Sequence, residues 1–301
     1  MIKIDFRNEK NQITRSVNMP ESWDEMSAAQ VRIIFEKYED LAGGKITRRQ
    51  FEILAVYTLV GITRGPSALA ARNAAIIENV TSLIKYVNFL FIDANPEIPV
   101  PQLSFKSIQN PLPSITVKGH KLYGPATLCQ DLTFGEFRNA AMALNGFFNT
   151  EDIASLDECI ANLYRPRAAK ANKAGRRVKP VKIETFEGDV AAVSTIKPWQ
   201  KNLVMLWFAS CINYLQSGTI SLGGEEVDLK MLFSDSDEPG TQPATWNDLL
   251  LQVSREGTIG NIEAVDEAPL MMILLHMWSN YKENKRNERI IKKAKKTKRV
   301  P

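Results

Sequence analysis

Apolar residues recur every three or four positions along much of the chain, the spacing that places them on one face of an α-helix. This period dominates residues 27–91 and 133–165, and it returns after residue 197. The expected helices cover residues 27–42, 47–62, 67–91, 133–148, 150–165, 198–215, 245–256 and 269 onwards. The pattern therefore predicts a mainly α protein built of helical bundles.

Local stop and start signals support these helices. Ser or Thr followed three residues later by Gln or Glu is the capping-box pattern. It occurs at Ser27/Gln30, Thr47/Gln50 and Thr133/Glu136. We also expect Thr150 to cap the helix that Pro166 ends, and Pro198 to open the next one.

The β signals are short and lie between the helices. Alternation over residues 1–20 predicts an N-terminal hairpin, and residues 219–229 predict another with its turn at Gly223-Gly224. Six prolines between residues 93 and 127 forbid a long helix there, while 103–108 and 114–124 read as short strands. We therefore expect a short N-terminal β-hairpin and minor β-structure in the connectors.

These signals divide the chain into four parts. We predict a hairpin and helical bundle over 1–92, a Pro-rich connector over 93–127 and a C-terminal helical domain over 128–281. The last domain carries a basic loop over 165–182, and a basic tail follows over 282–301.

Charge changes this picture, because the net charge of +4 hides a strong asymmetry. Residues 282–299 contain 10 Lys/Arg and 2 Glu, and residues 165–182 contain 8 Lys/Arg and no acid. The remainder holds 20 basic and 32 acidic residues. An acidic body with two basic segments differs from a uniformly basic nucleic-acid binder.

The basic residues of these two segments are the candidate interaction residues. They are Arg165, Arg167, Lys170, Lys173, Arg176, Arg177, Lys179, Lys292, Lys293, Lys295, Lys296, Lys298 and Arg299. Three interpretations stay open: a solvated loop and terminus, contact with an acidic protein surface, or contact with nucleic acid.

Catalytic chemistry finds little support in the sequence. The two histidines are far apart: His120 fits a turn, and His276 fits an apolar helix as a hydrogen-bonded core residue. No zinc-type spacing of Cys and His occurs, and three widely spaced cysteines suit reduced, buried thiols. We expect no enzyme activity, no catalytic or metal-binding residues and no cofactor.

No signal peptide is visible at the start of the chain. The best membrane candidates, 203–215 and 269–278, are shorter than the roughly 20 apolar residues that span a bilayer. We expect a soluble, intracellular protein without membrane contact.

The segment YGPATLCQDLTFGEFRNAAMALNGFFNTEDIASLDECIANLYRP (123–166) resembles a pattern in virion-morphogenesis proteins of tailed bacteriophages and prophages of Bacteroidetes hosts. In those proteins it follows an element similar to PESWDEM (20–26), and WQKNLVMLWFASCINYL (199–215) also fits. The resemblance spans most of the chain, but its motifs are apolar and structural. It carries over no catalytic residue.

The resemblance implies a non-enzymatic helical adaptor or chaperone in tail assembly, or a minor structural protein of the virion. The implied partners are a tape-measure, tail-tube or neck component, with a homo-oligomer possible. The implied location is the host cytoplasm during assembly, with retention in the virion left open. The alternative is a nucleic-acid-binding accessory or minor head/neck protein that uses the basic loop and tail.

Overall fold

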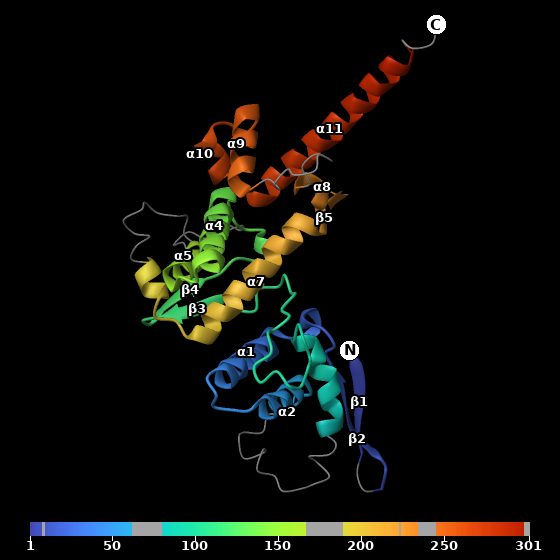
Figure 1. Cartoon of the computed structure of the whole chain (residues 1–301), viewed down its shortest axis with the longest axis vertical. Helices are drawn as coiled ribbons and strands as arrows, with labels where there is room; N and C mark the ends of the chain where they lie inside the picture. Colours follow the sequence, from blue (N-terminus) through green and yellow to red (C-terminus); the bar gives the residue numbers. More distant parts are fainter. Residues whose placement is uncertain (8–9, 62–79, 167–188, 223, 234–244, 298–301) are drawn as a thin grey trace. The chain divides into compact units, whose positions relative to one another are not determined.

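The computed structural model describes residues 1–7, 10–61, 80–166, 189–222, 224–233 and 245–297 (Figure 1). The described chain is mainly α-helical, with three small two-stranded antiparallel sheets, so the predicted fold class is confirmed. Two compact units can be distinguished. Unit 1 comprises 1–113 and 195–210, and unit 2 comprises 114–194 and 211–301.

Unit 1 begins with the predicted hairpin. Its strands β1 (Ile2–Arg7) and β2 (Ile13–Met19) are antiparallel, with Ile2 opposite Met19 and a bulge between Phe6 and Arg7. The helices that follow are η1 (Trp23–Glu25), α1 (Ala28–Ala42), α2 (Arg48–Leu59) and η3 (Ile84–Leu90). Of the helix predicted over 67–91, residues 67–79 lie outside the described residues, and its last part is the 3₁₀-helix η3.

An aromatic cluster and one buried arginine organise unit 1. The ring of Trp23 lies 4.9 Å from that of Phe105 and 5.9 Å from that of Phe35. Arg48 pairs with Glu52 at 3.0 Å and also donates to the carbonyls of Ala94 (2.9 Å) and Ile98 (2.8 Å). The Pro-rich segment is therefore held against α2 by the guanidinium.

Two predictions for the connector fare differently. Residues 103–108 form no strand, and Leu103 makes only an isolated bridge with Phe91, so that prediction is wrong. Residues 114–124 do contain a hairpin, β3 (Ser114–Val117) and β4 (His120–Tyr123).

The two observed units differ from the four predicted parts. The boundary after Pro113 falls inside the predicted connector 93–127, and residues 195–210, which were predicted in the C-terminal domain, belong with unit 1. They include the first part of α7 (Pro198–Ser217), where the backbone N–H of Trp199 donates to the carboxylate of Glu39 at 3.1 Å. The indole of Trp207 also donates to the carbonyl of Ile108 at 3.2 Å.

Unit 2 is built around a helical pair, α4 (Phe134–Thr150) and α5 (Ile153–Leu163), which pack against each other. Further helices of this unit are η4 (Thr127–Cys129), α8 (Lys230–Phe233), α9 (Trp246–Glu256), α10 (Ile262–Glu267) and α11 (Leu270–Thr297). The predicted second hairpin is present as β5 (Thr219–Leu222) and β6 (Glu225–Asp228).

All three predicted capping boxes form, because each Ser or Thr side chain accepts from the N–H three residues later. The prediction of Thr150 as a cap is wrong. Thr150 is the last residue of α4, and its hydroxyl donates to the carbonyl of Gly146 at 2.9 Å. Asp152 caps α5 instead, accepting from the N–H of Ala154 at 3.0 Å.

The end of α5 confirms one prediction and corrects another. Leu163 and Tyr164 are fully buried, and the helix stops before Pro166 as expected. Arg165 was a candidate interaction residue, but it is only 5% exposed. Its backbone pairs with Tyr123, and its side chain lies 3.7 Å from Glu136 and donates to the carbonyl of Asn162. Arg165 therefore belongs to the interior.

Candidate interaction surface on helix α11

The first turns of α11 are anchored in unit 2. Leu270, Ile273 and Leu274 are fully buried. The segment before the helix pairs with the start of α4, since the N–H of Leu270 donates to the carbonyl of Leu132 at 3.0 Å. Arg138 strengthens this connection with hydrogen bonds of 3.2 and 2.9 Å to the carboxylate of Asp266.

A second contact fixes the middle of the helix. His276 makes a 2.8 Å contact with Glu256 at the end of α9, and Asn280 lies 3.1 Å from the same imidazole. The His276 side chain is 14% exposed. The histidine is therefore hydrogen-bonded and partly buried, as its place on an apolar helix predicted.

Two aromatic rings and one acid mark the point where α11 leaves this packing. Trp278 and Tyr281 are stacked, with ring centroids 5.5 Å apart. Glu225 of β6 accepts from the Trp278 indole at 3.3 Å and pairs with Lys282. The hydrogen bond from Lys282, and then that from Trp278, lower the pKa of Glu225 below its ordinary value.

Beyond this point the helix continues as what we call the basic arm, residues 282–297. Every residue from 282 to 291 is exposed, so no face of the helix is covered there by described residues. The predicted tail over 282–301 is thus, as far as Thr297, the continuation of α11. In Figure 1 it is the red end of the chain's last helix.

The charges of the arm are concentrated on one side. The arm holds 8 Lys/Arg and 2 Glu, whereas the described part of unit 2 before it holds 6 Lys/Arg and 15 Asp/Glu. At 100° per residue, most of the basic positions fall within an arc of about 120°. This basic stripe consists of positions 282, 285, 286, 289, 292, 293 and 296. Lys295 and both glutamates fall outside it.

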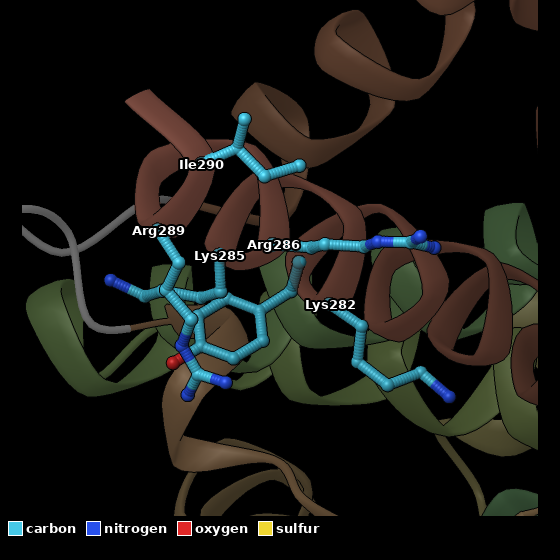
Figure 2. A pocket seen from close by; sticks show the side chains of 6 residues that line it. Lys282, Lys285, Arg286, Arg289 and Ile290 are labelled. Atoms are coloured by element: carbon cyan, nitrogen blue, oxygen red, sulfur yellow. The ribbon is translucent and has the colours of Figure 1, made fainter. Parts of the chain in front are cut away.

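Figure 2 shows the described side chains of this region, which line a shallow pocket. The pocket residues are Tyr281, Lys282, Lys285, Arg286, Arg289 and Ile290. Ile290 points away from Lys282 and Arg289, in agreement with its position off the stripe. The surface can attract and hold an anion.

The cations of the stripe differ in how far they are already paired. Lys282 is occupied by Glu225, and Lys285 lies 3.6 Å from Glu288 in a pair that is half exposed. Arg286 and Arg289 form no ion pair with any other described residue. These two guanidinium groups are therefore the most available charges of the surface.

The predicted interaction residues fall into three groups. Lys292, Lys293, Lys295 and Lys296 lie in the helical arm, and Arg165 is buried. The remaining ones, Arg167 to Lys179, Lys298 and Arg299, lie outside the described residues. Lys282, Lys285, Arg286 and Arg289 were not selected, although their spacing of three and four residues is visible in the sequence.

Other chemistry-bearing residues do not converge where the structure can be described. His120 begins β4 and is exposed, and all three cysteines are buried thiols. Burial raises the pKa of the Cys159 thiol. Within the described ranges, no three His, Cys, Asp or Glu side chains are grouped to hold a metal ion. No helix of those ranges has the length and apolar character to cross a membrane.

Comparison with known proteins gives no relative: no family model matches the chain, and neither the curated proteins nor the solved structures yield a significant match.

Proposed function

We propose that the chain is a non-enzymatic phage morphogenesis protein that acts as a helical adaptor or chaperone in tail assembly. One structural observation carries this proposal: α11 leaves a packed, acidic unit and continues as an exposed basic helix. The resemblance of residues 123–166 to phage morphogenesis proteins supplies the biological setting.

The physical reason is that an exposed helix of this kind gains little from its own fold. Isolated helices shorter than about 12–15 residues are marginal in water, and most helices in proteins owe their stability to the packing of an apolar face. A helix that is polar on all sides is typical of a segment that crosses solvent to reach another domain. The arm has the character of a contact element.

An adaptor needs at least two contact surfaces. In this proposal the packed helices of unit 1 or unit 2 hold a tape-measure, tail-tube or neck component, and the basic arm provides a separate contact. Binding takes place in the host cytoplasm during assembly, and the chain can also form a homo-oligomer.

The test is co-expression of the tagged chain with each tail-tube, tape-measure and neck protein of the same phage, followed by affinity capture. We expect one of them to be retained in a defined stoichiometry. The informative comparison is a chain that ends after Tyr281, which removes the arm but none of the buried residues of α11.

Retention by both forms places the protein contact on the packed units, and loss with the shorter form places it on the arm. Circular dichroism of the shorter form must show that the remaining helices are intact. Failure of the full chain to retain any of these components would refute the proposal.

A further inference from the structure

We propose that the basic stripe of α11 binds the phosphate backbone of double-stranded nucleic acid without reading its sequence. This inference rests on the proposed function only in treating the arm as a contact element. The tail component held by the packed units is a separate matter, so the two proposals can fail independently.

The charge density along the stripe matches that of one strand along the axis of a duplex. From position 282 to position 296 the helix rises about 21 Å, at 1.5 Å per residue. Seven basic positions in this length give one positive charge per ~3 Å, close to the 3.4 Å per phosphate of one strand of a duplex. No residue other than Lys or Arg falls on the stripe between these positions.

The composition of the arm favours phosphate over a protein surface. Six of its eight cations are lysines, a residue that is depleted in protein–protein interfaces. Its two large apolar residues, Ile290 and Ile291, are 55% and 53% exposed and lie off the stripe. They do not provide the apolar centre on which most of the binding energy of a protein interface depends.

The same residues favour a duplex, and the stripe offers no Asn or Gln for reading adenine. Proteins that hold single strands stack successive bases on aromatic rings. Residues 282–301 contain no aromatic residue, and the two rings next to the stripe, Trp278 and Tyr281, are stacked on each other. Direct readout of adenine uses Asn or Gln, and Asn284 and Asn287 both fall outside the stripe. Backbone contacts by Lys and Arg carry no sequence information.

Arg286 and Arg289 are the residues on which the test should be made. Both belong to the stripe, neither forms an ion pair with another described residue, and both are exposed. Substitution by Gln removes two charges and keeps good helix formers in place. Exposure also means that no buried packing is lost.

The experiment measures binding of the full chain to a fluorescein-labelled DNA duplex by fluorescence anisotropy between 50 and 200 mM salt. With about six phosphates contacted, affinity should fall roughly 1,000-fold over this range. The variant R286Q/R289Q should bind about 50-fold more weakly at 0.1 M salt, since each phosphate contact contributes a factor of about 8 there.

Two variants serve as controls. R286K/R289K keeps both charges and should bind within a few-fold of the natural chain, because Lys also contacts phosphate as a point charge. K230Q/R255Q removes two exposed charges from the packed part of unit 2 and should leave binding within about threefold. Together the two controls distinguish the effect of charge on the stripe from the effect of the net charge of the chain on binding.

An RNA duplex bound about as tightly as the DNA duplex supports the shared phosphate chemistry. A single strand preferred by tenfold or more would overturn the assignment to a duplex. Absence of binding at 50 mM salt, or binding that R286Q/R289Q leaves unchanged, would overturn the role of the stripe. Retention of a tail component in the capture experiment would still uphold the adaptor proposal in either case.

Discussion

Gly135 lies where α4 packs tightly against α10, and its replacement by Ala has two opposing effects on stability. A Cβ at this position would meet the Cβ, Cγ and backbone oxygen of Asp266, each at 3.0 Å. Helix propensity alone favours Ala over Gly by up to about 1 kcal/mol. Overpacking of a tight site typically costs 1–3 kcal/mol.

The cost of overpacking should exceed the gain in helix propensity, because the neighbours of Gly135 cannot easily move. Asp266 is held by two hydrogen bonds from Arg138, and the adjacent Phe134 N–H donates to the carbonyl of Ala268 at 2.8 Å. Shifting α10 to admit a methyl group would strain these contacts. We expect Gly135→Ala to lower the free energy of unfolding by about 1–2 kcal/mol, from the two effects together.

Urea unfolding followed by circular dichroism measures this change, and the same helix offers a matched control. A Cβ at Gly146 would lie 3.6 Å from the Ser155 hydroxyl oxygen, an ordinary contact distance. Gly146→Ala should therefore raise the free energy of unfolding by about 0.5–1 kcal/mol. If Gly135→Ala were as stabilising as Gly146→Ala, the close packing of α4 on α10 would be refuted.

Three further predictions concern unit 2. Asp152→Ala should cost about 1 kcal/mol of stability through loss of the α5 cap, whereas Thr150→Ala should cost clearly less, as urea unfolding can show. Leu163→Ala should cost about 2–5 kcal/mol in the same assay, because the side chain is fully buried. The pKa of Glu225 is lower in the folded chain than in the unfolded chain. The stabilising contact with Lys282 is therefore fully present above the pKa that Glu225 has in the unfolded chain, and it is lost as the pH falls through the lower pKa of the folded chain. NMR titration should find that the pKa of this carboxyl rises toward its ordinary value in Lys282→Gln, with the Trp278 hydrogen bond still in place, and an unchanged titration would contradict the pairing.

The helices were predictable to the extent that their signals are local. Each capping box needs only two residues three positions apart, and all three predicted boxes form. The prediction for Thr150 is wrong because α4 runs two residues further than expected, to Thr150, and is followed by Glu151, whose φ of 56° is left-handed. That conformation places Asp152, and not Thr150, at the start of α5.

Contacts between distant parts of the chain could not be predicted. Arg165 stands at the head of a run of basic residues, and only its proximity to Glu136, 29 positions earlier, shows that it belongs to the interior. The return of residues 195–210 to unit 1 likewise depends on partners such as Glu39 and Ile108. A single sequence contains no record of such pairs.

The charge of the candidate site was visible in the sequence, but its shape was not. Composition shows 10 cations between 282 and 299, and this is equally compatible with a fraying terminus. The helix places seven of the basic positions on one side, whereas Lys295 and both glutamates fall outside that side. The sequence contained this spacing, yet the predicted residues began only at Lys292.

The acidity of unit 2 makes the length of the arm matter. Charges in water are screened beyond about 8 Å at physiological salt, and the stripe extends about 21 Å from Lys282. Glu225 neutralises the inner end of the stripe, where the acidic side chains of the unit would also repel a phosphate. The outer positions lie beyond the screening distance from Glu225. Substitutions that remove charge should therefore weaken binding of nucleic acid more at Arg289 than at Lys282.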